Sequence, residues 1–217
     1  MNEDKQIIAG GLLIMFEGID GVGKTTQIEM ASKALQSQGW LVNTSRSPGG
    51  TPIGEALREV LLQPLARPAM TDLYIAAAIQ ESLIELIDAQ RAAGPVMLHD
   101  RGPLSTAAYQ IYGGGVDPEV GWSHVDDGMK RLKPDLIIMY ECDPQVALSR
   151  VRAHSTQNDY YEDQPLSYFE KVAEGYKEAI KRYPAAVIDA SQPIDQVHQE
   201  TMRRISKLLE EKTNRAA

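Results

Sequence analysis

At 217 residues, the chain is long enough to form one α/β domain with a substantial core, and we expect a single domain over residues 1–217. Its formal net charge of −8 argues against a broad electrostatic grip on nucleic acid, so no nucleic-acid partner is expected. One cysteine excludes an internal disulfide, and the polar start and short apolar runs predict a cytoplasmic protein without membrane contact.

Short apolar runs alternate along the chain with stretches of helical periodicity. Strands that alternate with helices favour a parallel sheet, so we expect an α/β fold whose five-stranded parallel sheet carries helices on both faces. The expected strands cover residues 12–16, 41–44, 96–98, 136–140 and 186–188. The expected helices cover residues 25–38, 53–62, 69–92, 105–112, 118–131, 144–152, 166–182 and 194–212.

A phosphate-binding loop follows the first expected strand. It fits the pattern Gly-x-x-x-x-Gly-Lys-Thr and reads Gly18-Ile19-Asp20-Gly21-Val22-Gly23-Lys24-Thr25-Thr26. The glycines let backbone N–H groups turn inward around phosphate oxygens, because no Cβ blocks the turns. Lys24 can reach the β and γ phosphates, Thr25 can hold Mg²⁺, and the following helix presents its positive N-terminus. The loop therefore predicts a bound nucleoside triphosphate.

Two arginines follow neighbouring strands, at the edge where ligands of parallel sheets gather. Arg46 comes after the second expected strand, and Arg101 comes after the third. A planar guanidinium suits bidentate capture of a phosphate, so this pair favours an acceptor that itself carries a phosphate. Asp100 is expected either to bind Mg²⁺ through water or to hold Arg101 in place.

A polar stretch at residues 154–159 interrupts two expected helices and predicts a lid over about residues 150–163. Arg150 and Arg152 stand at the start of this lid. Arginines on a closing lid can neutralise charge during phosphoryl transfer. Their spacing of two places them on different sides of a helix, so we expect only one of them to face the phosphates.

Taken in order, these motifs resemble the thymidylate kinase family of P-loop nucleoside monophosphate kinases. The matching segments are residues 16–27, 46–51, 100–101, 104–110, 133–136 and 188–193. The resemblance implies a P-loop nucleoside monophosphate kinase fold with a lid. It also implies transfer of the γ-phosphoryl group of ATP to dTMP with Mg²⁺, giving dTDP and ADP, in a homodimer.

The resemblance also implies a role for individual residues. Asp20 would lie between donor and acceptor, Tyr109 would crowd the sugar where a ribose 2′-hydroxyl sits, and Tyr74 would stack on thymine. The implied acceptor site comprises Asp20, Arg46, Pro48, Tyr74, Arg101, Thr106 and Tyr109. The expected catalytic residues are Asp20, Lys24, Arg101, Arg150 and Arg152, and the expected metal residues are Thr25 and Asp100. Ala190 and Gln192 would border the adenine of ATP.

Three positions depart from the family pattern. Ala78 stands where relatives usually place an arginine that reads the thymine edge, and Ser47 replaces a glutamate of Arg-Glu-Pro-Gly-Gly. Tyr160 replaces the arginine of the lid pattern Asp-Arg-x-Glu. Gly21, where some relatives carry an arginine, indicates the subtype that takes this charge from the lid. Our hypothesis is that Arg150 or Arg152 supplies it.

Alternatives to a dTMP kinase remain open at this point. Ala78 leaves room for a different or larger base edge, which would suit a deoxynucleoside monophosphate kinase with altered base specificity. The missing lid arginine would suit a nucleotide-binding homologue impaired in catalysis. A plain NTPase switch explains Arg46, Arg101 and Tyr109 least well.

Overall fold

A computed structural model describes residues 5–154 and 160–216. Within these residues the chain forms one five-stranded sheet in the order β2-β3-β1-β4-β5, and every pairing is parallel. The expected α/β fold and its sheet are confirmed. The strands are β1 (Leu12–Glu17), β2 (Val42–Arg46), β3 (Val96–Asp100), β4 (Leu136–Glu141) and β5 (Ala186–Asp189). Each strand runs one or two residues further than predicted and ends in a charged residue.

The register brings the strand ends together. Phe16 of β1 is level with Asp100 of β3, and Asp100 is level with Arg46 of β2. The phosphate-binding loop leaves β1 directly after this level. Three predicted site segments therefore start from one edge of the sheet, as the ligand-binding edge of a parallel sheet requires.

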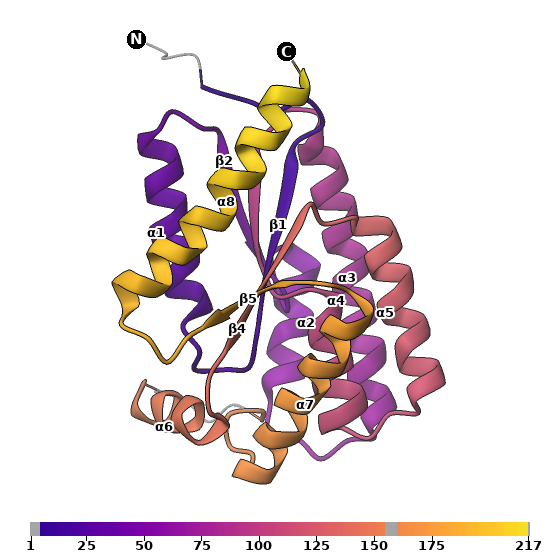
Figure 1. Cartoon of the computed structure of the whole chain (residues 1–217). Coiled ribbons are helices and arrows are strands. Elements are labelled where there is room, and N and C mark those ends of the chain that lie inside the picture. The colour runs from indigo at the N-terminus through magenta and orange to yellow at the C-terminus, as the bar shows by residue number, and fades with distance from the viewer. Residues whose placement is uncertain (1–4, 155–159, 217) are drawn as a thin grey trace.

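Helices cover both faces of the sheet (Figure 1). Helix α1 packs against α8 on one face, and the larger group around α3 and α5 lies on the other face. Both chain ends described lie at the opposite end of the sheet from α6. The helices are α1 (Lys24–Ser37), α2 (Pro52–Leu62), α3 (Ala69–Arg91), α4 (Pro103–Thr106), η1 (Ala107–Gly113), α5 (Pro118–Leu132), α6 (Pro144–His154), α7 (Leu166–Arg182) and α8 (Ile194–Ala216).

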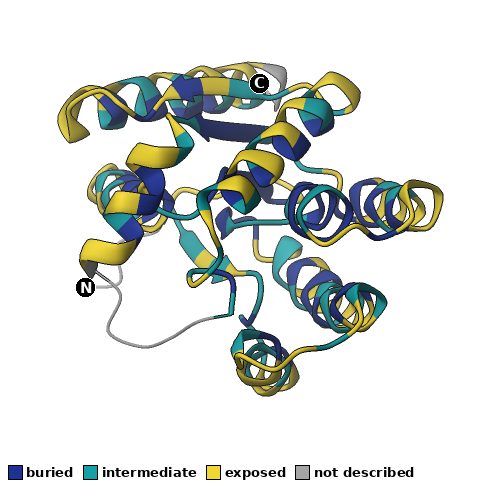
Figure 2. Ribbon diagram, turned by 90° about the horizontal axis from the view of Figure 1, so that it is seen from below, coloured by how far each residue is buried: buried dark blue, intermediate teal, exposed yellow. Residues whose placement is uncertain are grey.

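The core is centred on the middle strands. All six residues of β1 are buried, which explains why this strand is a continuous apolar run rather than an alternating one. Figure 2 shows the same separation, with buried residues on the strands and on the helix faces that turn toward them. Within the described residues, no helix is long and apolar enough to cross a membrane.

The predicted helix over residues 105–112 is the main departure from expectation. The chain instead forms the short α4 and then a π-helix, η1, which carries Tyr109 and Gln110. Helix α7 packs closely on η1, and a Cβ at Gly175 would lie 2.7 Å from the Cα of Ala108. Sequence periodicity does not distinguish a π-helix from an α-helix, and π-helical turns are frequent at functional sites.

Candidate active site

The phosphate-binding loop has the backbone that its glycines predicted. Gly18, Gly21 and Gly23 have φ values of 138°, 85° and 90°. A Cβ at Gly18 would lie 2.5 Å from the carbonyl oxygen of Tyr140, so no other residue fits there. Because α1 begins at Lys24, its unpaired N–H groups face the loop and form an anion site.

Lys24 folds back over this loop. Its ammonium donates hydrogen bonds to the carbonyl oxygens of Gly18, at 3.0 Å, and Ile19, at 2.9 Å. Burial, together with the positive charge of Arg101, lowers the pKa of Lys24 to about 8. The ammonium therefore lies beside the loop, held by two backbone carbonyl oxygens.

A donor cavity of about 630 Å³ opens beside the loop. Residues 20–27 line it together with Ala190, Gln192 and Arg150. Arg150 donates a hydrogen bond of 3.1 Å to the carbonyl oxygen of Ala190, whereas Arg152 is exposed and does not line the cavity. The structure therefore brings Arg150, and not Arg152, to the expected ATP site.

An acceptor cavity of about 330 Å³ lies on the other side of the loop. The two cavities share residues on their lining: Asp20, Lys24, Thr25 and Glu162. The acceptor cavity is also lined by the predicted residues Arg46, Pro48, Arg101, Thr106 and Tyr109. Two ligands bound in these cavities would meet at Asp20 and Lys24.

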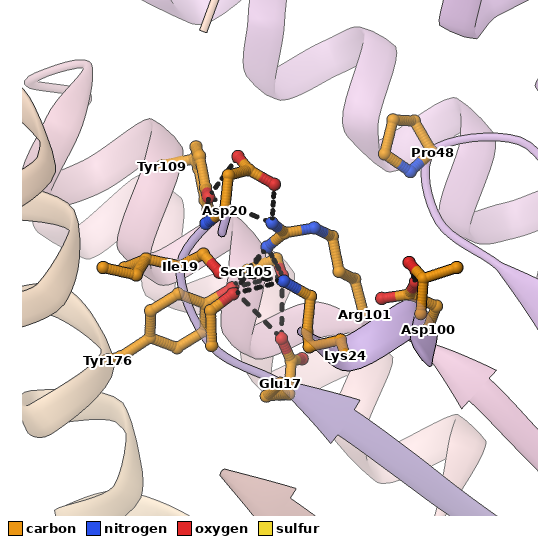
Figure 3. A network of polar contacts seen from close by, with 12 residues as sticks. Glu17, Ile19, Asp20, Lys24, Pro48, Asp100, Arg101, Ser105, Tyr109 and Tyr176 are labelled. Carbon is orange, nitrogen blue, oxygen red and sulfur yellow. Dashed lines mark hydrogen bonds and ion pairs between the residues drawn. The ribbon is translucent and has the colours of Figure 1, made fainter. Parts of the chain in front are cut away.

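Arg101 is the centre of a buried polar network at this junction (Figure 3). Its guanidinium forms an ion pair with Asp20 and donates hydrogen bonds to the hydroxyl groups of Tyr109, at 3.1 Å, and Tyr176, at 2.8 Å. The backbone of Arg101 has a φ of 66°, which few residues other than glycine adopt. This backbone strain at a site residue indicates that the surrounding contacts hold the guanidinium in place.

Asp20 stays ionised in this network. Burial opposes its charge, but the positive charges of Arg101 and Lys24 outweigh burial and lower the pKa of Asp20 to about 2. The hydroxyl of Tyr109 donates a hydrogen bond of 2.7 Å to the other carboxylate oxygen. Asp20 therefore serves as a fixed anion that orients Arg101 and Tyr109.

Three residues of the network were not predicted as site residues, namely Glu17, Ser105 and Tyr176. Glu17 is fully buried and accepts hydrogen bonds from the backbone N–H of Gly102, at 2.8 Å, and the hydroxyl of Ser105, at 2.7 Å. Burial raises the pKa of Glu17 to about 7, although these hydrogen bonds and nearby positive charges oppose the shift. A signal was available, because an acidic residue directly after a buried apolar strand needs a polar partner.

These observations allow comparison with known proteins. A family model described as thymidylate kinase matches residues 16–201. The thymidylate kinase of Verminephrobacter eiseniae is 36% identical over 202 residues, covering 88% of each chain. That of Geobacillus thermodenitrificans is 35% identical over 206 residues, covering 92% of each chain. That of Halalkalibacterium halodurans is 34% identical over 205 residues, covering 92% of this chain and 98% of the relative.

This chain belongs to the thymidylate kinase family. The match extends over most of the chain, and the structure supplies the phosphate-binding loop, the arginines at two strand ends and the two adjoining cavities within one domain. The family resemblance drawn from the sequence is confirmed. The thymidylate kinase pattern also implied roles for Thr25, Asp100 and Tyr74.

Thr25 and Asp100, the two residues expected to hold Mg²⁺, lie together. The hydroxyl of Thr25 donates a hydrogen bond of 3.0 Å to Oδ2 of Asp100, while Oδ1 of Asp100 is buried without a partner among the described residues. Mg²⁺ favours oxygen ligands and often takes only one or two from the protein, with phosphates and water supplying the others. The residues present fit Mg²⁺, although no cluster of three or more metal ligands occurs in the described part of the chain.

Tyr74 is not where a base-stacking residue would lie. It is 60% exposed, and its ring meets the edge of His124 at 6.5 Å between centroids. Ala78 lies on the same outer face of α3 and is also exposed. The expectations that Tyr74 stacks on thymine and that Ala78 opens space beside it do not fit this structure. The α3 residues that line the acceptor cavity are instead Ala76, Gln80 and Leu83.

The structure also shows what surrounds Ser47, the second departure from the family pattern, and its neighbour Arg46. Arg46 finds a carboxylate partner on α2, since it donates a hydrogen bond of 2.9 Å to Glu55. Ser47, which stands where the thymidylate kinase pattern has a glutamate, simply lines the acceptor cavity. The carboxylate beside Arg46 thus comes from a different segment of the chain.

The end of the expected lid is anchored to the part of the chain that runs from the end of α2 to the first turn of α3. The backbone N–H of Tyr160 donates a hydrogen bond of 3.0 Å to Leu62, and the Tyr160 ring lies 4.7 Å from the guanidinium carbon of Arg67. The neighbouring Tyr161 donates a hydrogen bond of 3.1 Å to Asp72 and lines the acceptor cavity. Tyr160, at the sequence position where the family pattern has an arginine, therefore packs against Arg67. Residues 155–159 of the expected lid lie outside the described residues.

Proposed function

We propose that this protein is an ATP-dependent dTMP kinase that transfers the γ-phosphoryl group of ATP to dTMP, giving dTDP and ADP. The observation that carries the proposal is the meeting of a donor and an acceptor cavity at Asp20, Lys24 and Thr25. Phosphoryl transfer requires little of the protein beyond alignment of the reactants and neutralisation of charge. The arrangement provides both, in a chain of the thymidylate kinase family.

On the donor side, the loop N–H groups and the N-terminus of α1 hold the phosphates of ATP. Lys24 exchanges its carbonyl partners for phosphate oxygens, and Ala190 and Gln192 border the adenine. Thr25 and Asp100 hold Mg²⁺, which when bound neutralises phosphate charge. Arg150 reaches the same cavity and supplies the positive charge that the loop lacks at Gly21.

On the acceptor side, Arg46 and Arg101 bind the phosphate of dTMP. Asp20 holds the Arg101 guanidinium in position, so that its charge faces the point where the two substrates meet. The ring of Tyr109 closes the cavity beside the sugar and leaves no room for a ribose 2′-hydroxyl. The base then extends toward the helices that close the other end of the cavity.

We also propose that the enzyme works as a cytoplasmic homodimer. Exposed apolar side chains on α2 and α3 support a partner surface: Ile53, Val60 and Tyr74. Light scattering coupled to size-exclusion chromatography measures the mass in solution directly. A mass near 24 kDa, that of one chain, would contradict the dimer.

A coupled ADP-release assay with ATP and Mg²⁺ tests the reaction. We expect dTMP to be the best acceptor among dTMP, dUMP, dCMP and dGMP, and Lys24→Ala to abolish turnover. If dTMP were no better than the other monophosphates, the proposed substrate would be wrong. ATP binding without turnover of any monophosphate would instead favour a homologue impaired in catalysis.

A further inference from the structure

The acceptor cavity has two chemically different ends. The end at the sheet edge is cationic on balance, because the three basic side chains of Lys24, Arg46 and Arg101 outnumber the two carboxylates of Asp20 and Asp100. The other end is formed by helices and the lid, and apart from Arg58 and Glu162 the side chains there are uncharged: Leu61, Leu62, Ala76, Gln80, Leu83, Thr106, Gln110 and Tyr161. A nucleoside monophosphate placed in this cavity puts its phosphate at the cationic end, so its base lies at the uncharged end. The polar groups there determine which base edge is accepted.

Gln80 is the α3 side chain at this end that can form hydrogen bonds. It is half-buried and shares a helix face with Ala76 and Leu83, which are apolar. Its carboxamide makes no hydrogen bond to any residue in the described part of the chain. By contrast, the amide of Gln110 donates a hydrogen bond of 3.4 Å to the hydroxyl of Tyr161. Gln80 thus offers the cavity a donor and an acceptor that are both unused.

Gly128 of α5 holds the Gln80 amide in a defined position. A Cβ built on Gly128 would lie 2.6 Å from both Cδ and Oε1 of Gln80, and slightly closer to Nε2. The three amide atoms are nearly equidistant from this point, so the flat face of the amide packs on the bare backbone of α5. Its edge, which carries the N–H groups and the carbonyl oxygen, is left to face the cavity.

We infer that Gln80 is a specificity-determining residue that reads the pyrimidine edge of the acceptor base. This inference rests on the proposed nucleoside monophosphate kinase function. A carboxamide accepts from N3–H of thymine and donates to O4, which matches that edge with two hydrogen bonds. Turned over, the same amide donates to N3 of cytosine and accepts from its 4-amino group. The two bases differ most simply at the 4-position, where thymine carries an accepting oxygen and cytosine a donating amino group. A guanidinium placed against that position, which only donates, would match O4 of thymine and not the 4-amino group of cytosine.

With this amide, the enzyme therefore prefers dTMP over dCMP less strongly than it would with an arginine at position 80. Substitutions at Gln80 then move the preference in opposite directions. Gln80→Arg, which only donates, raises the ratio of kcat/KM for dTMP to that for dCMP by at least about tenfold. Gln80→Glu, which only accepts, lowers this ratio by a similar factor.

The experiment measures kcat/KM for both monophosphates by coupled ADP release, and their Kd values by calorimetry, in wild type, Gln80→Arg, Gln80→Glu and Gln80→Met. Gln90→Met, on the same helix but outside the cavity lining, is the matched control and keeps the wild-type ratio. Gln80→Met, which neither donates nor accepts, weakens binding of both monophosphates. Thermal unfolding confirms that each variant is folded.

Opposite shifts for the arginine and glutamate variants support the inference, whereas equal or absent shifts overturn it. The ratio of the two Kd values tests the role of Gln80 independently of whether the protein transfers phosphate. If the wild type binds both monophosphates but transfers no phosphate, the kinase proposal fails while the Kd ratios still decide the role of Gln80. If Gln80→Met leaves both Kd values unchanged, Gln80 does not contact the base.

Discussion

Tyr109 and Asp20 bind each other through two hydrogen bonds, although they lie 89 positions apart in the sequence. The Tyr109 hydroxyl donates to the Asp20 carboxylate at 2.7 Å and accepts from the Asp20 backbone N–H at 3.2 Å. This pair joins the π-helix η1 to the phosphate-binding loop. Through this pair, η1, which lines the acceptor cavity, and the phosphate-binding loop, which lines both cavities, are held in a fixed relative position.

Replacing Tyr109 by phenylalanine removes both hydrogen bonds, together with the one that Arg101 donates to the same hydroxyl, and keeps the ring. We expect kcat to fall about tenfold, because Asp20 then orients Arg101 less firmly, and stability to fall by about 1 kcal/mol. Steady-state kinetics and denaturant unfolding measure the two effects. Tyr183→Phe, which removes a hydroxyl bonded to Asp126 outside both cavity linings, is the control. Equal kinetic effects of the two variants would contradict a role for the pair.

Arg150 and Arg152 form a natural comparison. We expect Arg150→Ala to lower kcat by at least about tenfold, since Arg150 lines the donor cavity and supplies charge during transfer. Arg152→Ala should leave turnover unchanged, because Arg152 is exposed and lies outside that lining. Steady-state assays at saturating ATP separate these outcomes. Loss of activity in the Arg152 variant alone would reverse our assignment.

Glu17 gives the fold a dependence on pH. Its pKa is about 7 in the folded chain against 4.5 for an ordinary glutamate, so between these values the folded state holds a proton that the unfolded state has released. The contribution of this bound proton to the free energy of unfolding is complete below pH 4.5 and is lost as pH rises through 7. Relative to Glu17→Gln, which cannot ionise, the wild type should therefore lose up to roughly 3 kcal/mol between pH 5 and pH 8.

Denaturant unfolding of wild type and Glu17→Gln at several pH values measures this difference. The amide variant is the control for every other ionisable group, since all of them are retained. A stability gap that did not widen in favour of Glu17→Gln with rising pH would show that Glu17 is ionised throughout.

Asp100 should set the magnesium requirement. Removing the charge in Asp100→Asn leaves Thr25 with a hydrogen-bond partner but weakens the attraction for a divalent cation. We expect the Mg²⁺ concentration for half-maximal activity to rise at least about tenfold, with activity recovering at high Mg²⁺. Titrations of activity against Mg²⁺ measure this, and chelation should stop turnover in both proteins. An unchanged Mg²⁺ dependence would place the ion elsewhere.

The ion pair of Arg67 and Asp72 should anchor the lid segment. Both side chains are about 90% buried, with exposed fractions of 10% and 11%. Asp72→Asn leaves Arg67 buried without a counter-charge and also weakens the hydrogen bond from Tyr161. Removing one partner of a buried pair costs about 3–5 kcal/mol, which denaturant unfolding would detect.

The double variant Arg67→Met with Asp72→Leu is the informative comparison for this pair. It buries apolar groups of similar size and leaves no unpaired charge, so it should be more stable than Asp72→Asn. If the single and double variants were equally stable, the pair would contribute little to holding Tyr161 in the acceptor wall.

Local sequence patterns predicted the features that depend on neighbouring residues. The phosphate-binding loop needs glycines at Gly18 and Gly23 and a lysine beside them, all within a few residues, and the structure keeps that arrangement. The positions of Arg46 and Arg101 followed from the rule that parallel strands end at one edge. These predictions required no knowledge of how distant segments pack.

Features that depend on distant packing were missed. The rotation of α3 about its own axis decides whether Tyr74 or Gln80 faces the cavity. In this orientation, the Gln80 side chain packs against Gly128 of α5. The hydrogen bond between Glu17 and Tyr176 joins residues 159 positions apart. A pattern read along one chain carries no information on which distant segments pack together.

The shared lining of the two cavities has a kinetic consequence. Asp20, Lys24, Thr25 and Glu162 line both cavities, so we expect a substitution at any of them to change the apparent affinity for ATP and for the monophosphate together. Gln80 and Gln192 each border only one cavity, so their variants alter one Michaelis constant at a time. Variants of this enzyme should therefore fall into two groups, those that change both Michaelis constants and those that change one. The residues of the first group mark where the phosphoryl group passes between the cavities.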